Sequence, residues 1–280
     1  MTLATTAELI ERARSGAVGL PAFNVITLEH AEAIAAGAER AGCSAILQIS
    51  ENAVKFHGGR LGPIAAATVE VARQAGVELS VHVDHVEDPA VLHQAADSGI
   101  SSAMFDASHL DYDANVASTR DAARWAHARG ILLEAELGKV GGKDGAHAPG
   151  VRTDPREAAD FVAATGVDAL AVAVGSSHAM VARTASLDLD LIRRLAAALP
   201  VPLVLHGSSG VADAMLADAV GAGMVKINIG TIINVAWTAA IREVLDADPE
   251  VVDPRNYVRP ARDAVTDVVA HLCTVIGSPT

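Results

Sequence analysis

Short apolar runs alternate with longer segments of helical period along almost the whole chain. The runs are rich in Val, Ile, Leu and Ala and are bounded by turn-forming residues, which is typical of strands buried on both faces. We predict strands over residues 19–25, 44–50, 78–85, 101–108, 131–138, 168–175, 202–208 and 224–230. The segments between them end in Gly or Pro, as helices commonly do, and predict helices that cover the sheet.

Eight such strand–helix units are the number found in a closed parallel barrel. We therefore predict an α/β fold in which residues 1–280 form a single-domain (β/α)8 TIM barrel. Residues 3–15 predict an extra N-terminal helix below the barrel, and residues 261–276 predict a C-terminal helix. An open doubly wound sheet is the alternative, but no GxGxxG motif follows the first strand.

The composition and net charge of the chain limit the kinds of molecule that it can bind. The 280 residues are 51% hydrophobic, and 34 acidic against 21 basic residues give a formal net charge of −13. An acidic chain with 3% aromatic residues is a poor match for nucleic acid. The N-terminus lacks the apolar core of a signal peptide, and no stretch approaches the ~20 apolar residues of a membrane span. We expect a cytoplasmic protein without a membrane partner.

The two cysteines, Cys43 and Cys273, lie far apart in the sequence and form no CxxC motif. This spacing gives little support to a disulfide framework or to a zinc site built from thiolates. We predict that both are reduced residues of the core.

Polar residues gather where the predicted strands end, which in a barrel of this type is the edge that carries active sites. These residues are Asn24, Ser50, Asp84, His85, Asp106, Ser108, Glu136, Gly138, Gly175, His178, His206, Gly207, Asn228, Gly230 and Thr231. Gly, Ser and Asn alone could cap strands without any function. Three histidines and three carboxylates on the same edge instead favour a catalytic site.

The histidines at the ends of the third, sixth and seventh strands predict a metal site. Imidazoles of His85, His178 and His206 would leave an open position for a substrate oxygen, which is the arrangement of a catalytic Zn²⁺. Asp106 and Glu136 point to the same edge and could hold a second divalent or a monovalent cation, or provide alternative ligands. The other interpretation is that these two carboxylates only form hydrogen bonds at strand ends.

Asp84 is the candidate for proton transfer. It shares one strand face with His82, whereas His85 lies at the end of the strand and can turn outward. A ligand and an acid or base would then stand side by side, as proton transfer next to a Lewis acid requires.

Two glycine-containing segments, residues 206–210 (HGSSG) and 228–231 (NIGT), follow the seventh and eighth strands; we call them the phosphate loops. These two positions hold phosphate in many barrels, and a helix N-terminus adds oriented N–H groups. We therefore predict an anionic substrate. The glycine-rich segment 138–155 is the longest predicted loop and is a candidate to close over the site, the alternative being a passive surface loop.

The motifs resemble those of the class II, zinc-dependent ketose-bisphosphate aldolases, which include the fructose-1,6-bisphosphate and tagatose-1,6-bisphosphate enzymes. The resemblance rests on AFNV, HVDH, MFDAS, LEAELGKVGG, TGVDALAVAVGSSH, LVLHGSSGV, KINIGT and DPRNYVRPAR, in this order along the chain. It implies a barrel, usually a homodimer or homotetramer, that reversibly cleaves a phosphorylated ketose to dihydroxyacetone phosphate and an aldehyde.

The same resemblance implies residue roles. His85, His178 and His206 would bind Zn²⁺, Asp84 would exchange the proton of the C4 hydroxyl, and Asp106 and Glu136 would match the second-cation positions. Contacts with the substrate would come from Asn24, Ser50, Gly207, Ser209, Asn228, Gly230 and Thr231. Arg259 resembles an arginine that reaches the distal phosphate bound by a neighbouring subunit, unless it only forms a surface ion pair.

Two positions depart from the family pattern. Lys143 and Asp144 stand where many members have an acidic pair, so Asp144 would have to protonate the enediolate with a side chain one methylene shorter than Glu. Ala179 stands where members usually have Gly after the histidine, and it could narrow the phosphate or monovalent-cation pocket. These departures predict an aldehyde partner that differs from glyceraldehyde 3-phosphate.

Two other functions remain open. A Schiff-base aldolase would need a desolvated lysine, for which Lys226 is the candidate. A noncatalytic partner subunit of an aldolase would keep the barrel and lose the chemistry, yet this chain retains Asp84 and all three histidines.

Overall fold

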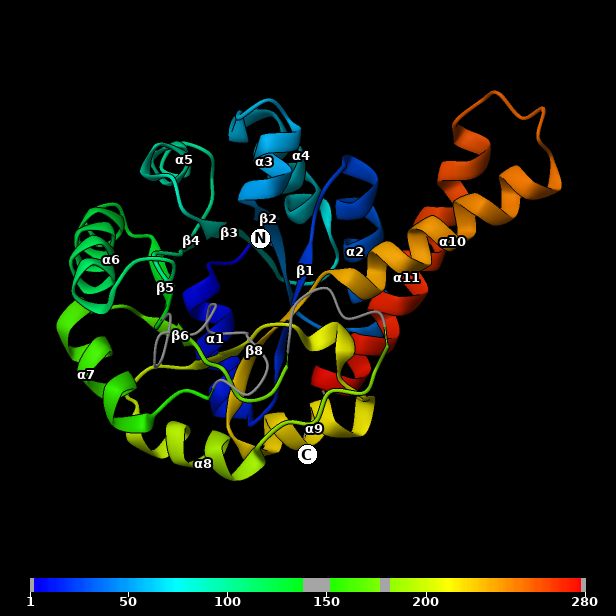
Figure 1. The fold of residues 1–280 in the computed structure, drawn as a ribbon. Coiled ribbons are helices and arrows are strands. Elements are labelled where there is room, and N and C mark those ends of the chain that lie inside the picture. Colours follow the sequence, from blue (N-terminus) through cyan, green and yellow to red (C-terminus); the bar gives the residue numbers. More distant parts are fainter. Residues whose placement is uncertain (1–2, 138–151, 177–181, 278–280) are drawn as a thin grey trace.

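The computed structural model describes residues 3–137, 152–176 and 182–277. Eight parallel strands form a closed barrel in which each strand pairs with the next and β8 pairs with β1 (Figure 1). The strands are β1 (Leu20–Asn24), β2 (Ala45–Ser50), β3 (Leu79–Val86), β4 (Ser102–Phe105), β5 (Leu132–Glu136), β6 (Ala169–Ala171), β7 (Leu203–Leu205) and β8 (Met224–Ile229). The predicted barrel and all eight predicted strand positions are confirmed.

Helices cover the outside of the barrel as the apolar spacing predicts (Figure 1). The helices of the described residues are α1 (Thr6–Gly16), α2 (Leu28–Ala41), α3 (Glu51–Phe56), α4 (Leu61–Gln74), α5 (Pro89–Gln94), α6 (Tyr112–His127), α7 (Pro155–Thr165), α8 (Leu189–Ala198), α9 (Asp213–Ala222), α10 (Thr231–Ala247) and α11 (Arg255–Gly277). The C-terminal helix begins earlier than predicted, at Arg255, and therefore contains Pro260 within its second turn.

The extra helix α1 closes the amino-terminal end of the barrel, as predicted. Leu9 and Ile10 of α1 pack with Leu20 and Ile46 of the first two strands. The hydroxyl of Thr6 also donates a 3.0 Å hydrogen bond to Ser80 Oγ on β3. This end is therefore filled with side chains, and the site must lie at the opposite, carboxyl end.

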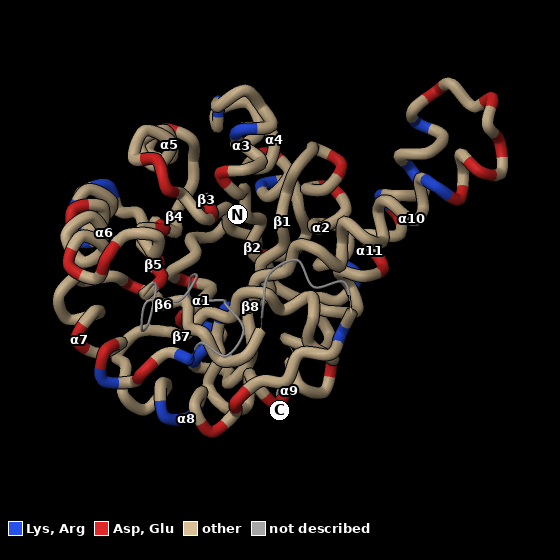
Figure 2. Tube along the Cα trace, viewed as in Figure 1, with Lys and Arg blue, Asp and Glu red and all other residues tan. Residues whose placement is uncertain are grey.

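Residues 231–260, which we call the arm, project away from the barrel (Figure 1). Its outer part carries acidic and basic residues side by side (Figure 2). Apolar Val235 and Val252 are also 48% and 87% exposed. The arm is anchored by the rest of α11, which approaches α2 so closely that a Cβ on Gly37 would lie 2.6 Å from Val269 Cβ.

The packing of α11 also brings together the two cysteines that the sequence separates. Cys43 follows α2, Cys273 lies on α11, and both are free. A hydrogen bond between the two thiols lowers the pKa of Cys43, whereas this bond together with burial raises the pKa of Cys273. Cys273 is buried and Cys43 is half-buried, so only Cys273 lies fully in the core, and the reduced state of both thiols stays a prediction. Among the helices described, none has the length and apolar character that crossing a membrane requires.

Candidate active site

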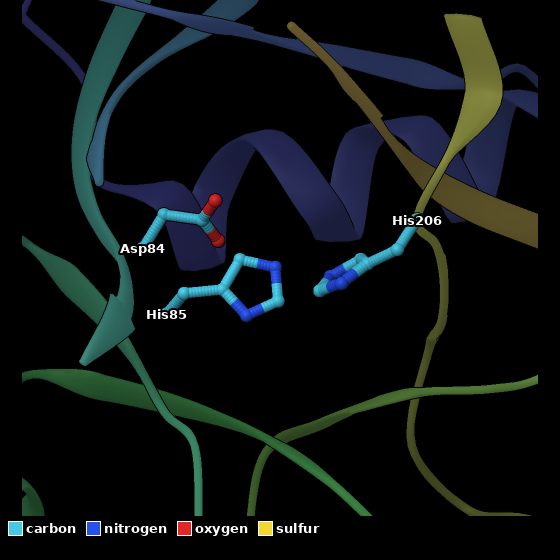
Figure 3. Close-up of side chains that lie close together, drawn as sticks. All are labelled: Asp84, His85 and His206. Atoms are coloured by element: carbon cyan, nitrogen blue, oxygen red, sulfur yellow. The ribbon is translucent and has the colours of Figure 1, made fainter. Parts of the chain in front are cut away.

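A backbone irregularity in β3 directs two consecutive side chains to the mouth of the barrel. Successive residues of a regular strand face opposite sides. Here His85 has a φ of 48°, in the left-handed region, and the pairing with β4 shifts register between Val83 and Val86. As a result, Asp84 and His85 both lie near His206, which follows β7 (Figure 3). The predicted outward turn at His85 therefore takes the form of a β-bulge.

The donor atoms at this mouth are close enough to share a cation. One ligand atom from each of Asp84, His85 and His206 lies within 4.8 Å of the others, and the same holds for His85, Asp106 and Glu136. The rings of His85 and His206 meet edge to face, with centroids 4.7 Å apart. Imidazole nitrogens and carboxylate oxygens in this arrangement fit a divalent transition metal. The third predicted ligand, His178, lies outside the described residues.

Asp106 and Glu136 surround the same two histidines. Asp106 Oδ2 lies 2.9 Å from His85 Nδ1, and Glu136 Oε2 lies 3.6 Å from His206 Nδ1. Burial alone would lower the pKa of His85, but the carboxylates of Asp84, Asp106 and Glu136 outweigh it and raise that pKa to about 10. A site this negative attracts a cation, and a metal ion bound there would displace the proton of His85.

Asp84 is buried but ionised. Burial would raise its pKa, yet His85, a hydrogen bond with His82 and the charges of Lys226 and His206 hold the pKa well below its usual value. Its Oδ1 lies 3.7 Å from His82 Nε2 and accepts a 3.4 Å hydrogen bond from Asn228 Nδ2. Asp84 can therefore accept a proton at neutral pH.

A charged pair lies inside the barrel beneath these histidines. Lys226 Nζ is 2.8 Å from Glu134 Oε2, and both side chains are almost completely buried. Burial would raise the pKa of Glu134, but Lys226 outweighs it and lowers that pKa to about 2. Because the ammonium group of Lys226 is held in this ion pair, it is not a free nucleophile, which argues against the Schiff-base alternative.

A cavity of about 350 Å³ opens beside the metal-ligand cluster. Its lining includes every substrate-binding residue predicted at the barrel mouth, namely Asn24, Ser50, Gly207, Ser209, Asn228, Gly230 and Thr231. It also includes Gln48, Asn52, Ser208 and Asn234, which the sequence analysis missed. Gln48 could have been found, because it precedes Ser50 by two residues and so shares its strand face.

The phosphate loops form one continuous wall of this cavity. Gly207 has a φ of 67°, and a Cβ on Gly230 would lie 2.7 Å from Asn24 Nδ2, so both positions require glycine. The N–H of Ile232, in the first turn of α10, donates a 3.2 Å hydrogen bond to Ser209 Oγ and joins the two loops. The N-terminus of a 17-residue helix thus faces the cavity, which suits an anion.

Two buried amide oxygens of the cavity have no hydrogen-bond partner among the described residues, Gln48 Oε1 and Asn228 Oδ1. Buried acceptors of this kind are costly unless a ligand or water supplies a donor. The hydroxyl groups of a sugar would supply such donors.

Two further predicted residues lie elsewhere. Arg259 lines a separate recess on the arm, together with Glu29, Arg255 and Arg262, so it does not reach the cavity of its own subunit. Asp144 lies outside the described residues, as does most of the predicted closing loop.

Comparison with known proteins agrees with this geometry. A model of class-II fructose-bisphosphate aldolases matches residues 4–280. The fructose-bisphosphate aldolase of Thermus caldophilus is 35% identical over 99% of this chain and 98% of its own, and that of Geobacillus stearothermophilus is 36% identical over the same shares. The crystal structure of the YdjI aldolase from Escherichia coli K12 superposes with a TM-score of 0.85 at 30% identity, covering 99% of this chain and 98% of that one. The chain therefore belongs to the class-II fructose-bisphosphate aldolases, a metal-dependent family of lyases that act in carbohydrate metabolism.

Proposed function

We propose that the protein is a zinc-dependent aldolase that reversibly cleaves a phosphorylated ketose to dihydroxyacetone phosphate and an aldehyde. Ketoses of the fructose 1,6-bisphosphate or tagatose 1,6-bisphosphate type are the candidate substrates. The observation that carries the proposal is the meeting of Asp84, His85 and His206 beside a cavity walled by the phosphate loops. That arrangement places a base, a cation site and an anion site within reach of one small molecule.

The phosphate loops would bind the phosphate of the dihydroxyacetone phosphate half. Gly207, Ser209, Gly230 and Thr231 offer backbone N–H groups and hydroxyls at the start of α10. Asn24, Ser50 and Asn228 would orient the hydroxyl groups of the substrate from the same cavity.

His85, His178 and His206 would hold the zinc ion, with Asp106 and Glu136 as alternative ligands or as a second site for a divalent or monovalent cation. Imidazole and carboxylate donors fit Zn²⁺, since it accepts nitrogen and oxygen ligands without redox chemistry. When bound, the ion would supply the positive charge that stabilises the enediolate form of dihydroxyacetone phosphate.

Asp84 would begin cleavage by taking the proton of the C4 hydroxyl. The C4 oxygen then becomes the aldehyde carbonyl, the C3–C4 bond breaks, and its electron pair passes to the dihydroxyacetone phosphate half as the enediolate. Asp144 is our candidate to return a proton to C3. The lowered pKa of Asp84 keeps it in the form that accepts a proton.

The residues that meet the distal end of the substrate determine which aldehyde is released. Among the described residues that line the cavity, none is Lys or Arg. The distal phosphate of a bisphosphate would therefore be met by Arg259 of a neighbouring subunit. If Arg259 does not reach it, an aldehyde other than glyceraldehyde 3-phosphate becomes the better partner.

We propose that the arm joins two copies of the chain in a homodimer or homotetramer. The arm exposes Val235 and Leu245 on α10 and carries Arg259 away from the cavity of its own subunit. An apolar surface on a projecting helix is typical of an interface between subunits.

The test is a coupled assay with fructose and tagatose 1,6-bisphosphates and the matching 1-phosphates, before and after treatment with EDTA. We expect turnover that EDTA abolishes and Zn²⁺ restores, and no trapping of the enzyme by borohydride. Turnover that survives complete metal removal, or borohydride trapping through Lys226, would overturn the zinc mechanism. Absence of turnover with every ketose phosphate would favour the noncatalytic partner subunit.

A further inference from the structure

The interior of the barrel contains a charged pair where apolar side chains are usual. Barrel interiors are mostly filled by layers of Val, Ile and Leu. Glu134 and Lys226 nevertheless lie in this interior with 1% and 0% of their surfaces exposed. Burying an ion pair seldom stabilises a fold more than apolar packing would. A role other than stability is therefore the better explanation of this pair.

Glu134 divides its two oxygens between a cation and a histidine. Oε2 lies 2.8 Å from Lys226 Nζ on β8, and Oε1 lies 3.1 Å from His206 Nε2. A carboxylate can only accept hydrogen bonds, so the shared proton belongs to Nε2 of His206. Nδ1 of His206 is then the unprotonated nitrogen, and it lies on the side of Glu136, at 3.6 Å from Oε2.

We infer that Glu134, held in place by Lys226, is a positioning residue that fixes the tautomer and the ring orientation of His206, so that Nδ1 faces the metal site. The inference rests on the zinc site proposed above. Carboxylates that bind the far nitrogen of a metal-ligating histidine act in this way in other metal sites. Lys226 neutralises the carboxylate, so this support adds no net charge beneath a mouth that already holds Asp84, Asp106 and Glu136.

Two double variants separate positioning from simple packing. Lys226→Met with Glu134→Gln and Lys226→Met with Glu134→Leu both remove the two charges, so neither leaves an unpaired buried ion. The first retains an amide oxygen that can accept from His206 Nε2, and the second retains no acceptor. Ser102→Ala is the matched control, because Ser102 is buried and binds His82 and Thr6 but touches none of the proposed ligands.

The measurement is the Zn²⁺ dissociation constant of the full-length proteins, from competition with a chromophoric chelator, together with the melting temperature of each metal-free protein. We expect the Leu variant to bind zinc about 10- to 100-fold more weakly than wild type. We expect the Gln variant and the Ser102→Ala control to stay within about threefold of wild type, an estimate based on the retained acceptor. The metal-free melting temperatures of the two double variants should agree.

Equal zinc affinity in the Leu variant and wild type would overturn the inference, as would equal losses in the Leu and Gln variants. If the Leu variant does not fold, Glu134→Met with Lys226→Met carries the same test, because the unbranched Met also lacks an oxygen acceptor. Wild-type protein that binds no zinc would refute the proposed function instead, so the two failures are distinguishable.

Discussion

The end of β8 contributes to the mouth of the barrel and the chain that follows it forms the arm, but the side chains of these two regions meet opposite surroundings. Asn228, at the end of β8, is buried and contacts Asp84 inside a cavity. At the far end of the same segment, Val252 is almost fully exposed. Reacting groups are thus held by strands and by one another, whereas the arm presents apolar surface to solvent.

The mouth and the arm therefore have different roles, one in chemistry and the other in assembly and stability. At the mouth, neighbouring charged groups determine whether a side chain is ionised. His85 lowers the pKa of Asp84 and Asp84 raises the pKa of His85, so each favours the ionised form of the other. At the base of the arm, burial is the main influence on the pKa of His30. The ring of this residue, on α2, stacks on Trp237 of α10 with centroids 4.3 Å apart. We therefore expect changes at the mouth to affect chemistry and changes in the arm to affect assembly and stability.

The largest expected effect is that of Asp84→Asn. Losing the proton acceptor should lower kcat by about a thousandfold, as is common for a general base, while the three histidines retain the zinc ion. Steady-state kinetics and zinc analysis check this, with exposed Asp97→Asn as the control. A kcat within tenfold of wild type would show that Asp84 is not the base.

The second effect concerns the pH dependence of stability at the base of the arm. Burial lowers the pKa of His30 from 6.5 to about 4. The unfolded chain therefore binds a proton near pH 6.5 that the folded protein accepts only near pH 4. The free energy of unfolding should fall by up to about 3 kcal/mol between these values and be unaffected by His30 above them.

His30→Phe isolates this contribution, because it keeps an aromatic ring beside Trp237 and cannot be protonated. Denaturant unfolding of both proteins from pH 7 to pH 4 should show a shallower loss of stability in the variant. Parallel curves would contradict the assignment of this pH dependence to His30.

The third expected effect tests whether the arm of one subunit contributes to substrate binding at the mouth of its neighbour. If Arg259 reaches the distal phosphate in a neighbouring subunit, Arg259→Ala should raise KM for a ketose bisphosphate about tenfold, the equivalent of about 1.4 kcal/mol, and leave kcat nearly unchanged. Arg255→Ala is the control, because its guanidinium is exposed and already binds Asp253. An unchanged KM would leave Arg259 as a surface residue.

The smallest effect on catalysis is expected from Leu245→Asp in the arm. A buried carboxylate should prevent two apolar surfaces from meeting, so sedimentation velocity should show smaller particles than wild type. Turnover of a ketose 1-phosphate per subunit should remain within about twofold, because the reacting groups lie at the mouth. An unchanged sedimentation coefficient would place the interface elsewhere.

The sequence predicted the barrel well, because buried parallel strands produce apolar runs that are easily recognised. It also predicted that Asp84, His85 and His206 would meet, since the carboxyl ends of such strands converge. The arm was missed because the apolar residues of α10 resemble those of a helix that covers the sheet. The left-handed backbone at His85 was missed too, because its bulge depends on pairing with β4.

Some misses could have been avoided. Glu134 and Glu136 are two residues apart in an otherwise apolar strand, so both had to face the barrel interior. Only Glu136 lies at the end of the predicted strand, which is where active-site residues of a barrel are expected. Gln48 on β2 and Asn234 in the first turn of α10 also line the cavity from positions before or beyond a strand end.

The pairing of β1 with β8 and the 2.9 Å hydrogen bond from the Gly19 N–H to the Ile276 carbonyl have a consequence for biosynthesis. During translation, β1 emerges early and lacks one neighbour until nearly the whole chain has left the ribosome. α2 likewise lacks the helix that covers it. The nascent chain must therefore carry an open sheet edge and an uncovered apolar helix until synthesis ends, which is the period when chaperones can protect it from aggregation.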